Sequence, residues 1–547
     1  MYISRQEALF TLFQRCIPVI VLSSSLVSAL LWWWTQGQPQ AILTNGGVNI
    51  SAPLRCISYA PFRRPNASPF TPDFKVSKRD IEEDLKIIKQ VSSCVRTYGI
   101  SGGLDQVPQV ARELGMKVRL GAWLGNDKRA NQRELHEAIA LTKSHTDVVE
   151  LLVVGNEVLL RKDLLPIDLM TLLDHAKAQS AVPITYADVW EFWRNAPELA
   201  SHVDSISIHI LPYWEDEPVA APLAIEHVFS TYARMQQVFP NKRLWIGETG
   251  WPAAGRQRRG AIPDAATQMR FVREVAARGE REKIDVNIIE AFDQPWKRAL
   301  EGAMGGAWGL FDADGNARSQ NKALYVKDSH WWRGWLASLV GAMVGLSLTF
   351  ALKHKRLDKT IFMLAFALAG TLLPAQIDFI RLWSRTTQEM LMGAFNAAMV
   401  IAGSLALLAM NMMRKPSTRE RQLALIWAAM LFTAATSALV LLADPRYRGF
   451  SLALYALPAI VSIAVLFRPE GVFAYRRSTR FLSAILIFAA LGMLYQEKIS
   501  NTEAVILFTY WLCIALPAWL SAWLSPSFTL IARSPANNSA TAQSSGV

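Results

Sequence analysis

Apolar residues are distributed along this chain in two distinct ways. From about residue 45 to 330, short apolar runs alternate with amphipathic stretches such as 78–91 and 265–279. From about 331 to 532 the chain is largely apolar, and its charges gather in short clusters. Runs of roughly 20 apolar residues are long enough to cross a lipid bilayer as helices. The pattern therefore predicts a domain of mixed strands and helices followed by a helical membrane domain.

The first domain contains eight apolar runs that have the length of strands. Helical stretches separate these runs, which is typical of parallel strands joined by crossover helices. This α/β pattern fits one closed (β/α)8 TIM barrel, in which the reacting groups lie at the carboxyl ends of the strands. The predicted strands are 55–61, 93–100, 117–125, 149–157, 183–189, 204–214, 243–251 and 285–293.

The second domain and the amino-terminal region together predict eight membrane spans. Arg5 and Arg15 precede the first apolar stretch, but no small-residue cleavage pattern follows it, so we expect an uncleaved anchor. Three Trp residues at its end suit a membrane interface. The predicted spans are 17–34, 333–352, 360–380, 391–413, 422–443, 451–467, 480–495 and 504–524.

The loops between these spans predict an orientation. If the amino terminus is cytoplasmic, each inside loop carries four Lys or Arg, whereas the outside loops carry two, two and one. The positive-inside rule then places both termini in the cytoplasm and the first domain outside. The predicted organisation is a cytoplasmic tip and anchor (1–44), an extracytoplasmic barrel (45–330), a transmembrane domain of about seven helices (331–532) and a disordered cytoplasmic tail (533–547).

The net charge of +12 does not indicate a nucleic-acid partner. Basic clusters such as KHKRLDK lie between apolar runs, not on a face interleaved with base-stacking aromatics. The topology accounts for much of this charge, because inside loops of membrane proteins are rich in Lys and Arg. We therefore expect no nucleic-acid binding.

Cysteine usage leaves two alternatives open. Cys16 and Cys513 fall in predicted spans, so Cys56 and Cys94 remain in the outer domain. These two form either one bridge in an oxidising compartment or two unpaired buried thiols. No metal-ligand spacing is present, and we expect neither a metal nor another cofactor.

Two glutamates follow apolar runs of the predicted barrel. Glu157 stands in VELLVVGNEV at the end of the fourth strand, and Glu248 stands in RLWIGETGWP at the end of the seventh. The carboxyl ends of barrel strands share one rim, so the two side chains can meet although 91 positions separate them. Two carboxylates facing one cleft form an acid/base and nucleophile pair. The sequence thus predicts hydrolysis or transfer of sugars.

Five motifs stand out in the first domain: VRTYGI at 95–100, VVGNEV at 153–158, IGETGWP at 246–252, EAFDQPWK at 290–297 and WGLFDADGNAR at 308–318. In order and spacing they resemble glycoside hydrolase family 17, the β-1,3-glucanase and glucan-transglucosylase family. The resemblance covers about half of the chain. It implies that Glu157 is the general acid/base and Glu248 the nucleophile of a retaining mechanism, and that Asn156 hydrogen-bonds the sugar 2-hydroxyl. The chain departs from the pattern at Gln294, where many family members carry Glu.

Aromatic and polar residues near the predicted strand ends are candidates for sugar contacts, because flat rings suit the apolar faces of pyranoses. For each ring, the alternative is packing under the loops. For Asp293 and Lys297, the alternative is a salt bridge within the loop. His209 is expected to be a hydrogen-bonded barrel residue, with a substrate contact as the alternative. The run RQRRG at 256–260 is expected to be a solvated surface, with contact to anionic lipid as the alternative. The predicted substrate-binding residues are Asn156, Tyr59, Tyr213, Trp251, Asp293, Trp296 and Lys297.

Hydrolysis and transfer share one glycosyl-enzyme intermediate and differ only in the second acceptor. Membrane tethering favours transfer, because remodelling of a nascent glucan at a membrane benefits from an anchor. We therefore expect a β-glucosyltransferase that elongates or branches β-1,3-glucan, with β-glucan as donor and acceptor. The alternatives are an endo-β-1,3-glucanase and a glucan-binding export or assembly component. Resemblance and topology place the barrel on the periplasmic side of a bacterial inner membrane, with the bilayer and other glucan synthesis proteins as partners.

Overall fold

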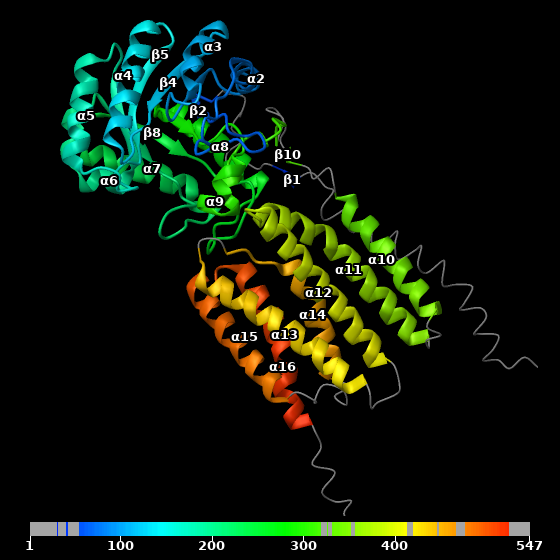
Figure 1. Ribbon diagram of the computed structural model, residues 1–547. Coiled ribbons are helices and arrows are strands. Elements are labelled where there is room, and N and C mark those ends of the chain that lie inside the picture. The colour runs from blue at the N-terminus through cyan, green and yellow to red at the C-terminus, as the bar shows by residue number, and fades with distance from the viewer. Residues whose placement is uncertain are drawn as a thin grey trace, which may run out of the picture.

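The computed structural model contains a closed barrel and a bundle of long helices (Figure 1). The predicted fold class is confirmed. Apart from residue 30, the predicted anchor at 17–34 lies outside the described residues, as does the predicted tail at 533–547. The structure describes residues 30, 40–41, 54–318, 325–326, 331–351, 356–412, 419–445, 448–466 and 476–524.

The barrel has eight parallel strands. Each strand pairs with the next in the chain, and β9 pairs with β2 to close the ring. Every predicted strand contains one of these strands, but most are shorter than predicted because apolar runs continue into loops at the rim. The strands are β2 (Cys56–Ser58), β3 (Cys94–Arg96), β4 (Lys117–Ala122), β5 (Val149–Asn156), β6 (Ile184–Val189), β7 (Ser205–His209), β8 (Arg243–Thr249) and β9 (Val286–Ile288).

Helices cover the outside of the barrel (Figure 1). In α2, Ser77 and Asp80 form a capping box at the amino terminus, and Ile81, Leu85 and Ile88 bury one stripe of the helix. In α8, Asp264 caps the first turn. The helices around the barrel are α2 (Lys78–Ile88), α3 (Val107–Glu113), α4 (Lys128–Ser144), α5 (Pro166–Gln179), α6 (Trp190–Asn195), α7 (Ala221–Val238) and α8 (Ala265–Glu282).

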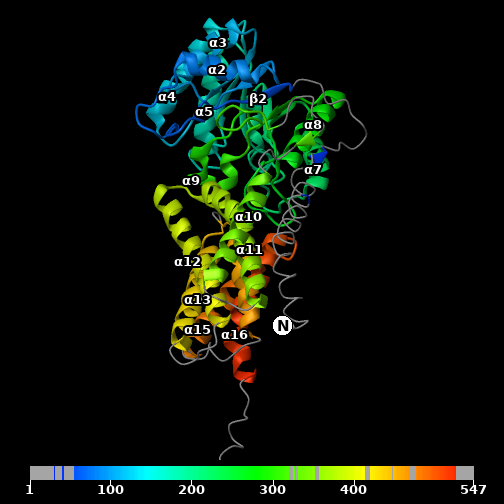
Figure 2. The same ribbon diagram turned by 90° about the vertical axis from the view of Figure 1, so that its right-hand side faces the viewer.

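Long helices form the carboxyl-terminal region, and the barrel lies at one end of them in both views (Figures 1 and 2). Within the part of the chain that the structure describes, five helices contain a stretch long and apolar enough to cross a membrane, and α14 is apolar but shorter. Their crossing and orientation remain predictions. The helices are α10 (Trp332–Ala351), α11 (Arg356–Trp383), α12 (Thr387–Met412), α13 (Arg419–Ala443), α14 (Leu452–Leu466), α15 (Arg476–Glu497) and α16 (Thr502–Leu524).

The prediction of a solvated surface at 256–260 is wrong. Gln257 is only 2% exposed, and both Arg256 and Gln257 contact the ends of the helices. The charged composition of this run suggests a surface, but here the polar groups bond to another part of the chain. Nothing in a local pattern of Arg and Gln distinguishes a solvated loop from a polar contact between domains.

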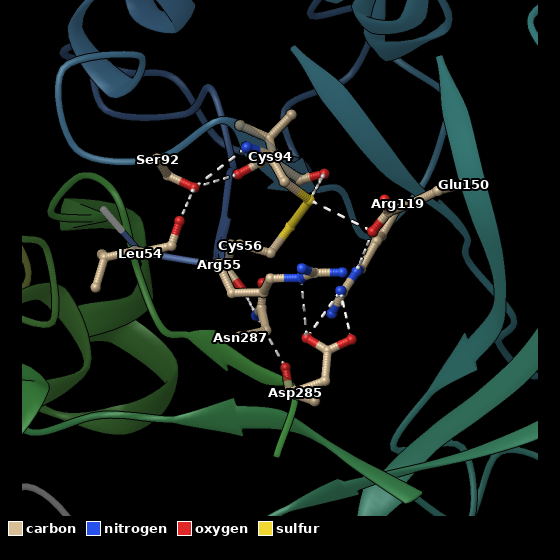
Figure 3. Close-up of a disulfide and its surroundings, with 12 residues drawn as sticks. Leu54, Arg55, Cys56, Ser92, Cys94, Arg119, Glu150, Asp285 and Asn287 are labelled. Carbon is tan, nitrogen blue, oxygen red and sulfur yellow. Dashed lines mark hydrogen bonds and ion pairs between the residues drawn. A yellow bond between two sulfur atoms is a disulfide. The ribbon is translucent and has the colours of Figure 1, made fainter. Parts of the chain in front are cut away.

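Cys56 and Cys94 form a disulfide between the neighbouring strands β2 and β3, which decides between the two alternatives left open (Figure 3). Each cysteine is the first residue of its strand, so the bridge lies at the end of the barrel opposite the strands' carboxyl ends. Beside it, the Arg119 guanidinium donates to Glu150 and to both carboxylate oxygens of Asp285. This end of the barrel is thus held by a covalent link and a buried arginine.

Replacing both Cys56 and Cys94 by Ser is expected to lower the free energy of unfolding of the barrel by up to about 4 kcal/mol. The bridge closes a loop with a sequence separation of 38, and removing it restores the entropy of the unfolded chain. Denaturant unfolding followed by tryptophan fluorescence measures the change, with Cys513→Ser as the control. Equal unfolding midpoints for wild type and the double variant would contradict the prediction.

Candidate active site

The ends of β5 and β8 bring the two glutamates together. Glu157 directly follows β5, and Glu248 is the penultimate residue of β8. One carboxylate oxygen from each, together with a ring nitrogen of His209, lie within 4.8 Å of one another. The two glutamates therefore meet on one rim of the barrel, in agreement with the position of their motifs at strand ends. This separation allows both side chains to act on one small group.

His209 lies between the two glutamates. It ends β7, is fully buried, and has Nδ1 2.9 Å from Glu157 Oε1 and Nε2 3.7 Å from Glu248 Oε1. A Cβ atom at Gly247 would lie 2.0 Å from Ser207 Oγ and 3.1 Å from the His209 ring. Glycine next to Glu248 thus lets the strands approach closely enough to hold the imidazole in place. The expected hydrogen-bonded barrel histidine is present: it is hydrogen-bonded to Glu157, and its Nε2 lies near Glu248 without a hydrogen bond.

Arg96, at the end of β3, fixes Glu248 from the other side. Its fully buried guanidinium donates to Glu248 Oε1 and to Asn156 Oδ1, and it lies over the ring of Tyr98. Burial raises the pKa of Glu248, but the nearby His209 and Arg96 lower it more, so that the pKa falls below its usual value. Glu248 is therefore held as a carboxylate although it is almost fully buried.

Glu157 has a different environment. Its side chain is 22% exposed, and its backbone has a φ of 53°, in the left-handed region that costs a residue with a side chain about 1–3 kcal/mol. The Glu157 N–H donates to Ala187 O, and its carbonyl accepts from Arg161 N, which holds this conformation. The strained backbone directs the carboxylate toward solvent and toward His209. Glu157 is therefore accessible to a ligand, whereas Glu248 is almost enclosed.

Two further buried acids lie near the pair. Asp188, in β6, accepts from Tyr186 and from Leu159 N, and burial, with a smaller contribution from the charge of Glu157, raises its pKa to about 6. Glu290 accepts from Lys297 Nζ through both carboxylate oxygens at 3.0 Å. Burial raises the pKa of Glu290 to about 7, although Lys297 acts in the opposite direction. Neither acid was identified from the sequence.

The predicted polar contacts are engaged within the protein. Lys297 is paired with Glu290, and Asp293 accepts from Gly309 N and Arg318. Burial raises the pKa of Asp293 to about 6 despite Arg318. For both Asp293 and Lys297 the structure therefore favours the salt-bridged loop over a direct sugar contact. Asn156 is 7% exposed and accepts from Arg96, next to the two glutamates.

Three of the predicted aromatic contacts are core residues. Tyr59, Tyr213 and Trp251 are fully buried, and their polar atoms donate to Asp84, Arg256 O and Ile262 O respectively. Their rings pack under the rim loops, which is the alternative that the sequence left open. Gln294 is also buried and donates to Ala60 O, so this side chain serves local hydrogen bonding.

Other rings remain partly accessible. Trp296 is half-buried and meets Phe70, which is 67% exposed, in an edge-to-face arrangement. Trp123 follows β4, is 40% exposed and lies against the Arg161 guanidinium at 4.2 Å. Trp190 and Trp214 are also half-buried, so these four Trp rings near the strand ends keep exposed ring surface for a sugar.

The atoms of Glu157, His209 and Glu248 are also close enough to hold a metal ion. The Arg96 guanidinium at Glu248 opposes this, because a second cation beside a buried arginine is repelled at short range. Glu157, His209 and Glu248 are better suited to proton transfer and nucleophilic attack than to holding a metal ion, because two carboxylates of unequal exposure lie beside one histidine.

Comparisons with known proteins find relatives of the barrel part of the chain. Curated relatives include a glucan 1,3-beta-glucosidase of Candida albicans, 25% identical over 260 residues, which are 43% of this chain and 83% of that protein. A glucan 1,3-beta-glucosidase of Schizosaccharomyces pombe is 27% identical over 235 residues, 40% of this chain and 73% of that protein.

Solved structures with a similar barrel include the β-1,3-glucanosyltransferase of Rhizomucor miehei in complex with laminaritriose, with 23% identity, a TM-score of 0.43, and coverage of 50% of this chain and 98% of that one. An endo-laminarinase from Formosa has 22% identity, a TM-score of 0.44, and coverage of 50% and 87% respectively. At the level of families, residues 56–309, which include both glutamates, match the model of the BtgE/BtgC glycoside hydrolase domain.

Proposed function

We propose that this chain is a retaining β-glucan transglycosylase that elongates or branches β-1,3-glucan at a membrane surface. The observation that carries the proposal is the approach of Glu157 and Glu248, with one carboxylate oxygen from each within 4.8 Å. Retaining glycosidases have carboxyl groups about 5–5.5 Å apart, whereas inverting enzymes need roughly 6.5–9.5 Å to admit a water. The match of residues 56–309 to a glycoside hydrolase domain and the names of the fungal relatives support β-1,3-glucan as the substrate.

The proposed mechanism follows from the unequal environments of the two acids. Glu248, held ionised by Arg96 and His209, attacks the anomeric carbon and forms a glycosyl ester. Glu157 protonates the departing glycosidic oxygen and then, as a base, takes the proton of the incoming hydroxyl. Asn156, next to Glu157, is placed to hydrogen-bond the 2-hydroxyl. Two displacements at one carbon give a β-linkage from a β-linkage.

Transfer is favoured over hydrolysis by the helical region. Five apolar helices could hold the barrel at a membrane, where a growing glucan chain is the nearest acceptor. We further propose, from the resemblance and the predicted topology together, that the membrane is a bacterial inner membrane with the barrel on its periplasmic side. The excess of Lys and Arg in the predicted inside loops supports the orientation. An endo-β-1,3-glucanase is the second candidate, because it needs the same intermediate and differs only in accepting water.

Product sizes distinguish the two candidates. The full-length chain in detergent is incubated with short β-1,3-gluco-oligosaccharides, and the products are separated by mass. Chains longer than the donor are expected, because the glycosyl-enzyme passes its sugar to a second oligosaccharide. Glucose and shorter chains alone would contradict transfer and favour the glucanase.

Replacing Arg96 by Met is expected to lower kcat/KM for β-glucan and to move the acidic limb of its pH profile to higher pH. Without the guanidinium, the pKa of Glu248 rises, so the carboxylate becomes protonated earlier as the pH falls. The dependence of kcat/KM on pH measures the shift. Arg96→Lys keeps the charge and is expected to return the limb toward its original position. An unchanged acidic limb in Arg96→Met would contradict this role.

A further inference from the structure

The loop at 250–262, which follows the nucleophile strand β8, contacts the ends of the long helices. Each polar group of Gln257 takes part in this contact, and its Nε2 also donates to Arg259 O within the loop. Its N–H donates to Glu503 Oε2 (3.2 Å), its carbonyl accepts from Asn501 Nδ2 (2.9 Å), its Oε1 accepts from Thr502 Oγ1 (2.8 Å), and its Nε2 donates to Ser500 O (3.0 Å). The donors and acceptors of Gln257 are thus complementary to the polar groups at the start of α16.

The surrounding groups extend this contact into a buried polar network. Arg256 donates to Pro445 O and lies 3.5 Å from Glu497, which also pairs with Arg448 at 2.6 Å and accepts from Asn501 at 2.8 Å. Glu497, Arg448 and Asn501 are at most 4% exposed. Buried polar groups are costly unless their partners are in place. The network therefore specifies one docked position of the loop on the helices.

The same loop is bonded to the barrel at the catalytic rim. Tyr213 OH donates to Arg256 O at 2.7 Å, and Ala253 N donates to Ala307 O at 2.7 Å. Trp251, only three positions after Glu248, packs edge to face against Tyr213. A displacement of the loop at Gln257 would therefore be transmitted to the end of β8 through Tyr213 and Trp251.

A second rim segment meets the helices as well. Arg298, in α9 (Arg298–Glu301) after β9, donates to Arg381 O near the end of α11 at 3.3 Å. In both views α9 lies beside the start of α12 (Figures 1 and 2). The loops after β8 and β9 both contact the helices, so the side of the rim nearest Glu248 is the docked side.

We propose that Gln257 is a positioning residue through which the helical domain holds the loop at 250–262 in the shape required for glucan binding and turnover. The helical domain then has a role in the barrel's chemistry beyond that of an anchor. The inference rests on the proposed function, because it concerns the same rim. It adds that the barrel works at full efficiency only while Gln257 is docked on the start of α16, since small displacements of a catalytic loop are costly.

Gln257→Glu is the sharpest test, because it keeps the shape of the side chain. It removes the Nε2 donor to Ser500 O and Arg259 O, and it adds a negative charge at the residue whose backbone N–H donates to Glu503. The like charges are expected to undock the loop and lower kcat/KM for β-1,3-oligosaccharides by about tenfold. Adding Glu503→Gln removes one of the two repelling charges. The backbone N–H of residue 257 can still donate to the amide oxygen of the new glutamine side chain. The double variant is therefore expected to recover most of the lost kcat/KM.

Gln236→Glu, on the exposed face of α7, is the matched control and is expected to behave as wild type. Oligosaccharide affinity, read by tryptophan fluorescence in the same proteins, is expected to weaken in Gln257→Glu and to recover in the double variant. Wild-type affinity and kinetics in Gln257→Glu would overturn the proposal. So would a loss that Glu503→Gln does not rescue, because a purely local role of Gln257 in the loop fold is not repaired from the helices.

The two proposals fail in different ways. If the wild-type chain neither lengthens nor shortens β-1,3-oligosaccharides, the proposed function is wrong, while the affinity series still decides the role of Gln257. If the wild type turns over glucan but Gln257→Glu is indistinguishable from Gln236→Glu in both measurements, only the positioning role is wrong.

Discussion

Replacing Glu248 by Gln is expected to lower the turnover of β-1,3-glucan by at least about a thousandfold, because the amide cannot form the glycosyl ester. The substitution keeps the size of the side chain, and its Oε1 can still accept from Arg96. The barrel should therefore fold normally, and its melting temperature should stay close to that of wild type. Initial rates with short β-1,3-gluco-oligosaccharides measure the loss. Glu198→Gln, the same change at an exposed position, is the control.

The stereochemistry of a second variant separates a nucleophile from a residue that only stabilises charge. Glu248→Gly opens space on the face from which the carboxylate attacks, and a small anion such as azide can enter there. One displacement by azide gives an α-configured glucosyl azide, whereas the wild type gives β-configured products by two displacements. Activity of Glu248→Gln close to wild type, or a β-configured azide, would contradict the role of Glu248 and favour a glucan-binding protein.

The barrel and its two glutamates were predictable because both depend on local patterns. Strand-length apolar runs spaced by amphipathic helices predict the fold, and a polar residue at the end of such a run lies on the rim. Glu157 and Glu248 both satisfy this rule. Strand ends were less predictable. The apolar run at 204–214 predicts a strand to residue 214, but β7 ends at His209 because Leu211–Trp214 form a turn.

The surroundings of the two glutamates could not be predicted, because they depend on contacts between distant strands. Arg96 lies in the motif VRTYGI at a strand end, a signal that was available, but only the closed ring shows that its guanidinium reaches Glu248. The pairing of Lys297 with Glu290 likewise needs the fold of the β9 loop. The predicted sugar contacts of Tyr213 and Trp251 do not agree with their full burial, because a ring near a strand end can face either the sugar or the core.

In the proposed mechanism, the different exposure of the two acids explains how one barrel can assign them different tasks. Glu248 is almost enclosed and surrounded by Arg96 and His209, so the ionised form is favoured even without water. Glu157 is more exposed and has the buried acid Asp188 nearby. Once the glycosyl ester forms, the negative charge of Glu248 is lost. The repulsion between the two carboxylates then disappears, so in the proposed mechanism Glu157 can act as a base.

Replacing Glu157 by Gln is expected to lower kcat/KM for β-1,3-glucan by about 10²–10⁴-fold, because the leaving sugar hydroxyl no longer receives a proton. The loss should be much smaller with aryl β-glucosides whose leaving phenol is acidic, since such a phenolate departs unprotonated. Comparing kcat/KM for a glucan and for a series of aryl glucosides measures this dependence.

Azide again gives a distinguishing result, and here the expected configuration is the opposite. In Glu157→Gln the nucleophile is intact, so the glycosyl ester still forms from an activated donor and azide replaces the deprotonated acceptor. Two displacements then give a β-configured azide. The same configuration from Glu157 and Glu248 variants would mean that the two carboxylates do not act from opposite faces of the sugar. A loss of activity that is equal for glucan and for activated glucosides would assign Glu157 to binding instead of proton transfer, because a proton donor matters in proportion to the basicity of the group it protonates.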